Sequence, residues 1–215
     1  MGKAQAKRLT GAKMTITEIR RKQRSKNIFY VYVDGKFWAE MLDETIVKFN
    51  LKIDKVLSQT ELESIFNASK PPLAMHLCLN LLDRSAKTKK EIFEYLAQKG
   101  FENDVAQSVT TKLENYGYLD DQKYAENFAL YKKNKGKKAL RFELKLKGVD
   151  EEIINSVLEK IENQKDVILG LAQKFLKNKK PAPDLRQKLF RHLAGKGFEF
   201  EEINSVITEI FKEQK

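Results

Sequence analysis

Cysteine, histidine and long apolar runs are scarce in this sequence of 215 residues. Cys78 is the only cysteine, so the chain can form neither an internal disulfide nor a cysteine-based zinc site, and we expect a reducing, cytoplasmic compartment. No stretch approaches the length of a bilayer-spanning helix, and the basic N-terminus lacks the apolar run of a signal peptide. We therefore expect no membrane contact.

Catalytic groupings are equally scarce. An enzyme needs a nucleophile with its base, a carboxylate pair in a cleft, a metal cluster or a loop that cradles phosphate. His76 and His192 each lie among apolar residues on a predicted helix, where a partly buried, satisfied side chain is a simpler interpretation than a ligand or base. We predict no enzymatic activity, no metal site and no cofactor. An enzyme of unrecognised type stays open because missing motifs are weak evidence.

Positive charge is what the sequence has in excess. It carries 41 lysine and arginine residues against 30 aspartate and glutamate residues, a formal net charge of +11. Such an excess raises the affinity for polyanions or for an acidic protein surface before any specific contact forms. The first hypothesis is therefore a partner that is nucleic acid or is bound to nucleic acid.

The N-terminal part of the chain predicts a small β module. Residues 1–13 are basic and aperiodic, which indicates a disordered arm. Short β-type runs follow at 14–19, 28–33 and 36–41, and Asp34-Gly35 supplies the positive φ angles of a type I′ hairpin turn. A small antiparallel sheet followed by a helix makes up the predicted module, residues 14–70.

Both faces of this sheet are predicted to be apolar. Alternation assigns Phe29, Val31 and Val33 to one face and Ile28, Tyr30 and Tyr32 to the other. We expect helices to cover one face, and we interpret the other as a packed cap or, alternatively, as an aromatic platform for nucleic-acid bases. The basic connection 20–26 has two interpretations as well, a solvated loop or a phosphate contact.

Helical signals begin after Asp43. Ser58 and Glu61 have the spacing of a capping box, in which a hydroxyl and a carboxylate satisfy backbone donors at a helix start. Pro71 and Pro72 follow soon after, and proline disfavours helix both at its own position and at the residue before it. We expect the chain to break here, which places a boundary between the β module and the C-terminal two-thirds of the chain.

Beyond Pro72 the chain repeats itself, with spacings of 48 and then 49 residues. Each copy contains a Lys-Gly-apolar triplet, a leucine four residues before the glycine and a serine eight residues after it. The three glycines are Gly100, Gly148 and Gly197. Because glycine enters the left-handed region without a Cβ penalty, each triplet predicts a sharp helix stop.

Helix starts are marked by Thr88 with Glu91, a second capping box, and by Asp120, Asp150 and Asp184. The predicted helices span residues 72–83, 89–99, 103–115, 121–134, 137–147, 151–163, 165–178, 185–196 and 200–213. They form three tandem three-helix repeats, residues 71–119, 120–163 and 164–215. The predicted fold is mainly α, an elongated, curved array of these repeats with the small β module at its N-terminal end.

Cations gather between the first and second helices of two successive repeats. A charge run is usually a solvated face, but two runs at corresponding places could form one stripe that contacts phosphates without reading sequence. The third helices open with carboxylates, which makes them unsuited to entering a major groove. The candidate binding residues are Lys132, Lys133, Lys135, Lys137, Lys138, Arg141, Lys145, Lys177, Lys179, Lys180, Arg186, Lys188 and Arg191.

Three features together resemble the bacterial RecX regulatory proteins. They are the hairpin 30–35, the Gly-Tyr-Leu-Asp-Asp segment 117–121 that runs on to Tyr124 and Phe128, and the three Lys-Gly-apolar stops. The resemblance covers residues 14–213. Gly136-Lys137-Lys138 stands where family members commonly carry a Gly-Pro-Arg-Arg helix start, so charge is kept while the proline is lost.

The resemblance implies a modulator of the RecA recombinase. Such a protein binds the RecA filament on DNA and typically inhibits RecA's ATP hydrolysis, strand exchange and coprotease activity, within DNA repair, recombination and the SOS response. We expect a monomer and leave room for weak direct DNA binding. The alternative is a stand-alone, sequence-nonspecific DNA-binding protein that uses the basic stripe.

Overall fold

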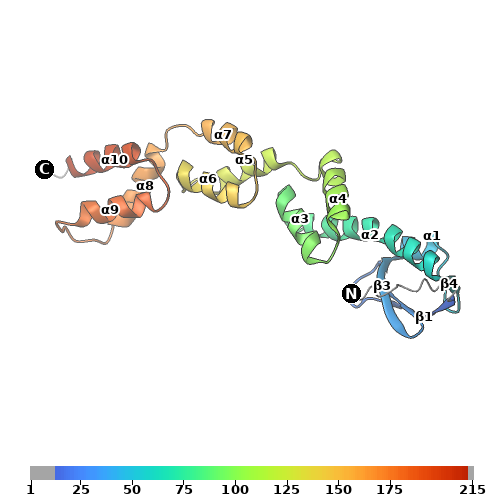
Figure 1. Ribbon diagram of the computed structural model, residues 1–215. Helices are drawn as coiled ribbons and strands as arrows, with labels where there is room; N and C mark the ends of the chain where they lie inside the picture. The colour runs from blue at the N-terminus through green and yellow to red at the C-terminus, as the bar shows by residue number, and fades with distance from the viewer. Residues whose placement is uncertain (1–12, 213–215) are drawn as a thin grey trace, which may run out of the picture. The chain divides into compact units, whose positions relative to one another are not determined.

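The computed structural model describes residues 13–212 (Figure 1). The predicted disordered arm lies outside these residues except for Lys13, which begins the first strand and pairs with Ser58. The strands are β1 (Lys13–Arg21), β2 (Ile28–Val33), β3 (Lys36–Leu42) and β4 (Val56–Ser58). The helices are α1 (Asp43–Lys48), α2 (Gln59–Leu82), α3 (Lys89–Gln98), α4 (Asn103–Asn115), α5 (Asp121–Tyr131), α6 (Lys137–Leu146), α7 (Glu151–Glu159), α8 (Lys165–Leu176), α9 (Leu185–Ala194) and α10 (Phe200–Lys212).

The chain divides into two compact units, and we describe each by itself. The N-terminal unit holds the residues up to Ser85 together with Tyr95–Leu113, and the C-terminal unit holds Ala86–Glu94 together with the residues from Glu114 onward. Helix α3 therefore contributes its first turns to the C-terminal unit and its last turn to the N-terminal unit.

The sheet of the N-terminal unit is antiparallel, with strand order β3-β2-β1-β4. Asp34 (φ 49°) and Gly35 (φ 76°) form the predicted hairpin turn, because both residues occupy the left-handed region that a type I′ turn requires. One face of the sheet packs under α1 and α2, where Val31, Met41 and Ile65 are buried. The prediction that helices cover one face is confirmed.

The second face of the sheet is covered at one end. Ile28, assigned to the same face as Tyr30 and Tyr32, is buried against Leu42 and Leu73 in a separate apolar cluster. Side chains of α2 and Phe101 cover this end of the face, whereas the register shift of β2 with β3 lies farther along, between Val31 and Tyr32. The face is therefore covered at the Ile28 end, while Tyr30 and Tyr32 stay half-exposed.

Helix α2 runs without interruption through Pro71 and Pro72, so the predicted break is wrong. Both halves of this helix bury apolar side chains. Leu62 and Ile65 pack against the sheet, and Leu73 belongs to the cluster around Ile28. Each buried leucine or isoleucine stabilises by about 2 kcal/mol, so these three together offset the roughly 3 kcal/mol that each of the two prolines costs inside a helix. Figure 1 shows α2 passing from beside the sheet to beside α4.

The helices beyond α2 start where the sequence predicts, at residues 89, 103, 121, 137, 151, 165, 185 and 200. Thr88 and Glu91 form the predicted capping box, and the Asp120 carboxylate accepts from the Lys123 backbone N–H. Asp150 and Asp184 occupy N-cap positions, but neither side chain makes a cap hydrogen bond. Asp184 instead pairs with Lys188.

The three predicted helix stops are confirmed. Gly100, Gly148 and Gly197 have φ angles of 84°, 76° and 82°, and after the first two the next residue donates a hydrogen bond back to the helix. Repeats 2 and 3 each have an apolar core, centred on Leu140 and Leu144 in repeat 2 and on Leu189 and Leu193 in repeat 3. A mainly α fold of tandem three-helix repeats with a small N-terminal sheet is therefore confirmed.

Candidate functional site

The C-terminal unit contains a contact that is formed twice at the repeat spacing. In the first, the Thr88 hydroxyl donates to the Lys147 carbonyl at 2.7 Å, at the turn that ends α6. The Lys147 ammonium reaches Glu91 at 2.6 Å, and Lys89 N–H donates to the buried Asp121 carboxylate at 3.0 Å. The start of α3 is thus hydrogen-bonded to the second repeat.

The second contact uses the corresponding residues of the next repeat. Gly136 N–H donates to the Lys196 carbonyl at 2.9 Å, and Lys138 N–H donates to the Gly197 carbonyl at 3.1 Å. Thr88 and Gly136 are 48 residues apart, and Lys147 and Lys196 are 49 apart. The start of each second helix therefore packs on the Lys-Gly turn of the following repeat, and we call these two contacts the repeat joints.

Glycine is required at the joints by close packing as well as by φ. A Cβ on Gly136 would lie 2.1 Å from the Gly197 carbonyl oxygen, and one on Gly197 would lie 2.4 Å from the Ala139 nitrogen. A Cβ on Gly148 would meet the Lys90 side chain at 2.3 Å, whereas Gly100 faces open space. Two backbones thus meet at the joint of repeats 2 and 3 with no room for a side chain.

Several predicted binding residues lie beside carboxylates, one of them across the joint between repeats 2 and 3. Arg141 pairs with Glu151 and also donates to Asn155 Oδ1 at 2.7 Å, and Lys138 reaches Glu199 at 2.8 Å. The remaining ion pairs that involve predicted binding residues are Lys135–Glu143, Lys145–Glu151 and Lys188–Asp184. These five cations are partly neutralised within the protein.

The acidic starts of the third helices therefore do not face away from the basic residues. Glu151 opens α7 and Glu199 precedes α10, and both lie within ion-pair distance of predicted stripe residues. Acidic and basic residues therefore lie side by side at these places. Glu151 lies near Arg141 because the turn after α6 folds α7 back against it, whereas Glu199 reaches Lys138 across the joint between repeats 2 and 3.

The other eight predicted residues make no ion pair among residues 13–212. Lys132 lies 6.0 Å from the Phe128 ring centroid and Lys179 lies 4.3 Å from that of Phe175, both in cation–π geometry. Arg191 makes only a long contact with Gln187, at 3.5 Å. The unpaired cations are Lys132, Lys133, Lys137, Lys177, Lys179, Lys180, Arg186 and Arg191.

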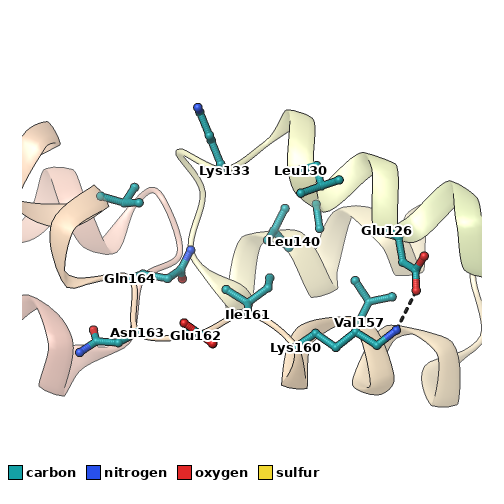
Figure 2. A pocket seen from close by; sticks show the side chains of 12 residues that line it. Glu126, Leu130, Lys133, Leu140, Val157, Lys160, Ile161, Glu162, Asn163 and Gln164 are labelled. Atoms are coloured by element: carbon teal, nitrogen blue, oxygen red, sulfur yellow. Dashed lines mark hydrogen bonds and ion pairs between the residues drawn. The ribbon is translucent and has the colours of Figure 1, made fainter.

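A pocket of about 590 Å³ opens beside Lys133 at the end of repeat 2. Figure 2 shows Leu140, Val157 and Ile161 among its lining, with Lys133 pointing away from them and the Glu126–Lys160 ion pair (2.8 Å) at one side. Sequence reasoning missed this pocket, because it forms only when α5, α7 and the connection to α8 come together.

The side-chain amide of Gln164 lines this pocket with only one of its two polar atoms hydrogen-bonded in the described part of the chain. Gln164 is 5% exposed, and its Nε2 donates to the Lys135 carbonyl at 3.1 Å. Its Oε1 accepts no hydrogen bond from the described part of the chain. The pocket can therefore receive an apolar group that carries a hydrogen-bond donor.

Exposed apolar side chains stand next to the unpaired cations of repeat 2. Leu130 is 72% exposed and Tyr131 is 88% exposed, directly before Lys132 and Lys133 in sequence. Leu130 also lines the pocket. We call Leu130, Tyr131, Lys132 and Lys133, with the pocket, the α5 patch.

The residues considered for chemistry give no catalytic grouping. Cys78 is fully buried, and burial raises the pKa of its thiol to about 12. His192 is more exposed than predicted, and its ring centroid lies 4.7 Å from that of Phe175. The partial desolvation of the imidazole, with Lys196 and Lys179 nearby, lowers the pKa of His192. Among residues 13–212, no three histidine, cysteine or acidic side chains cluster as metal ligands would, and no helix has the length and apolarity needed for a bilayer crossing.

The fold and these surfaces define the class as a protein of tandem three-helix repeats with an N-terminal sheet. Family models for the first, second and third three-helix domains of RecX match residues 74–113, 120–158 and 162–207. The chain is 31% identical over 202 residues to the regulatory protein RecX of Clostridium perfringens, across 91% of this chain and 95% of that protein. It is 29% identical over 201 residues to RecX of Staphylococcus epidermidis, across 91% and 75%.

Solved structures share the fold. A crystal structure of a regulatory protein RecX superposes with a TM-score of 0.64 at 22% identity, over 90% of this chain and 98% of that one. RecX from Lactobacillus salivarius superposes with a TM-score of 0.61 at 24% identity, over 66% and 97%. The chain belongs to the RecX family of regulatory proteins.

Proposed function

We propose that this protein is a non-enzymatic regulator that binds the RecA filament on DNA. It modulates, and typically inhibits, RecA's ATP hydrolysis, strand exchange and coprotease activity. The proposal places the protein in the cytoplasm as a monomer, within DNA repair, recombination and the SOS response. Family membership supports the regulatory role, and the α5 patch supports a protein partner.

The α5 patch is the observation that carries the proposal. Bare DNA would be served by Lys132 and Lys133 alone, whereas exposed Leu130 and Tyr131 beside an apolar pocket are typical of a protein–protein contact. A partner surface that combines carboxylates with a protruding apolar side chain would match both parts of the patch. A recombinase subunit in a filament can present such a surface repeatedly.

The test is RecA's single-strand-dependent ATP hydrolysis with the protein added below the RecA concentration. We expect a clear loss of hydrolysis, and a weaker loss with Leu130→Ser or with Lys132→Gln/Lys133→Gln. Lys123→Gln/Lys174→Gln, which removes two exposed lysines that have no ion-pair partner within residues 13–212, is the matched charge control, and Ile53→Ser is the apolar control. No effect of the parent protein on hydrolysis or on filament stability would refute the proposal.

A second candidate function is stand-alone, sequence-nonspecific DNA binding. The unpaired Lys177, Lys179 and Lys180 between α8 and α9 favour it. It predicts tight binding to bare DNA, with a logarithmic salt slope of about −0.9 for each phosphate contacted. Weak binding to bare DNA beside strong binding to RecA-coated DNA would exclude it.

A further inference from the structure

A second basic surface lies in the N-terminal unit and contains none of the predicted binding residues. The β1–β2 connection, the C-terminal half of α2 and the end of α3 enclose a cleft of about 670 Å³. Its cationic lining residues are Lys22, Arg24, Lys26, Arg84 and Lys99. We call it the basic cleft.

The basic cleft is unusual in its charge balance. No aspartate or glutamate is among the described residues that line it. Lys22 is paired with Glu40 at 2.7 Å, but Arg24, Lys26, Arg84 and Lys99 have no ion-pair partner within residues 13–212. Because four of the five cations converge here without a paired carboxylate in the described part of the chain, the cleft holds a positive potential that favours an anionic ligand.

Aromatic rings stand on the uncovered part of the neighbouring sheet face. Phe37 is 56% exposed and packs edge-to-face against Tyr30 and Tyr32, with ring centroids 5.8 and 5.9 Å apart. The Arg20 guanidinium lies 5.4 Å from the Tyr32 centroid and donates to the Tyr32 hydroxyl at 2.6 Å. Aromatic rings flanked by guanidinium groups are what unpaired bases stack on.

Lys22 connects the rings to the basic cleft. Its ammonium lies 5.5 Å from the Tyr30 ring centroid, and the residue also lines the cleft. Lys22 and Lys99 both line a smaller adjoining cleft of about 330 Å³ as well. Lys22 therefore lies between the Tyr30 ring and the basic cleft, so a ligand in the cleft lies next to the aromatic face of the same unit.

We propose that this surface binds single-stranded nucleic acid, with phosphates in the basic cleft and bases against Phe37 and the two tyrosines. A duplex keeps its bases stacked inside, so it could use the cleft but not the rings. The aromatic face, interpreted from the sequence as either a cap or a platform, is thereby assigned as a platform. This inference requires no RecA and stands apart from the function proposed for the α5 patch.

The first test measures binding of the full chain to a labelled oligothymidylate, without RecA, over a range of salt concentrations. The cleft variant Arg24→Gln/Lys26→Gln/Arg84→Gln removes three unpaired cations. Single-strand contacts contribute a slope of about −0.7 for each phosphate, so its logarithmic salt slope should become less steep by about 2. At about 0.1 M salt, this corresponds to a loss of affinity of between about tenfold and a hundredfold.

The matched control removes the same charge elsewhere on the unit. Lys48→Gln/Lys52→Gln/Lys112→Gln changes three exposed lysines outside the cleft. We expect this control to bind like the parent protein. Equal affinities and slopes for the cleft variant and the control would overturn the proposal, because general charge would then explain any binding.

The second test separates stacking from charge. Phe37→Ala should weaken oligothymidylate binding by about tenfold without changing the salt slope, because base stacking on an aromatic ring contributes to affinity independently of counterions. An abasic oligomer of the same length should bind Phe37→Ala and the parent protein equally. Ile53→Ala, which truncates another exposed apolar side chain of this unit, should behave like the parent.

Each outcome of these tests decides the proposal. An equal effect of Phe37→Ala on the abasic oligomer would overturn the stacking assignment, and equal affinity of the parent protein for duplex DNA would overturn the single-strand preference. Trp38 fluorescence and circular dichroism establish that each variant is folded. Since RecA is absent throughout, failure here leaves the ATP-hydrolysis test of the α5 patch untouched.

Discussion

A single methyl group added at Gly136 should break the joint between repeats 2 and 3. The backbone of Gly136 has a φ of −74° and a ψ of 162°, which alanine adopts freely, so the substitution introduces no φ strain. Its Cβ, however, would lie 2.1 Å from the Gly197 carbonyl oxygen and 2.2 Å from the Phe198 nitrogen. Both are backbone atoms, so no side-chain rotation relieves the contact.

The size of the effect depends on which contacts must separate. Moving the two backbones apart weakens the hydrogen bonds from Gly136 to Lys196 and from Lys138 to Gly197, each worth about 1 kcal/mol. Residual overpacking adds about 1–3 kcal/mol. We expect Gly136→Ala to lower the free energy of unfolding by about 3–5 kcal/mol, above the roughly 1 kcal/mol that alanine costs at an N-cap.

Three other glycines provide the controls. Gly170→Ala, inside α8 with open space around it, should stabilise by about 1 kcal/mol. Gly100→Ala, with a φ of 84° and open space, should cost about 1–2 kcal/mol from backbone strain alone. Gly197→Ala combines the same strain with the joint contact, so its excess over Gly100→Ala measures the joint.

The assay is urea unfolding followed by two signals. Far-ultraviolet circular dichroism reports the helices, while fluorescence of Trp38, the only tryptophan, reports the sheet of the N-terminal unit. Gly136→Ala should shift the dichroism transition and leave the Trp38 transition in place. If Gly136→Ala were as well tolerated as Gly170→Ala, the packing argument for the joint would be refuted.

Three further predictions concern individual side chains. Burial raises the pKa of the Glu91 carboxyl, but hydrogen bonds from Lys147 and the Thr88 backbone outweigh it and hold this pKa below its usual range. Glu91→Gln should therefore lower the free energy of unfolding by about 1 kcal/mol at neutral pH, and this difference should vanish as pH falls through the depressed pKa of Glu91. Urea unfolding midpoints of both proteins, measured across pH, test this prediction. A difference that stays constant with pH would contradict it. Cys78, buried and with its pKa raised to about 12, should resist a thiol reagent until the protein unfolds, and rapid labelling of the native protein would contradict its burial. Ser58→Ala removes the capping-box hydroxyl of α2 and should lower the Trp38 unfolding midpoint by an amount equivalent to about 1 kcal/mol, whereas Ser58→Asp should retain most of the stability.

Helix starts and stops could be predicted because their causes are local. Thr88 with Glu91 and the residues around Gly148 carry their own capping and left-handed geometry, which depends on a few neighbours in sequence. The repeat strengthened these predictions, because a capping or glycine signal that is weak in one copy recurs at the same position in the next. These features therefore determined nearly every helix start.

The sequence predictions failed where residues distant in sequence determine the local structure. Pro71 and Pro72 are helix breakers by local rules, yet burial of α2 on both sides of them keeps the helix continuous. The Arg141 ion pair depends on how α7 folds back on α6, and the Lys138 ion pair depends on the joint between repeats 2 and 3, so no charge count along the sequence could reveal them. The pocket beside Gln164 likewise exists only in three dimensions.

Ion pairing changes which cations are suited to a partner. A lysine such as Lys138, already 2.8 Å from Glu199, must give up that contact before it binds a phosphate, whereas Arg24 and Arg84 face no such competition. The cations best suited to a partner are therefore the unpaired ones, which include those of the α5 patch and those of the basic cleft. The first combines charge with aliphatic surface and the second combines charge with aromatic rings. A chain with one surface suited to protein and another suited to unpaired bases could contact both components of a nucleoprotein filament, and the RecA-free binding assay separates the two contributions.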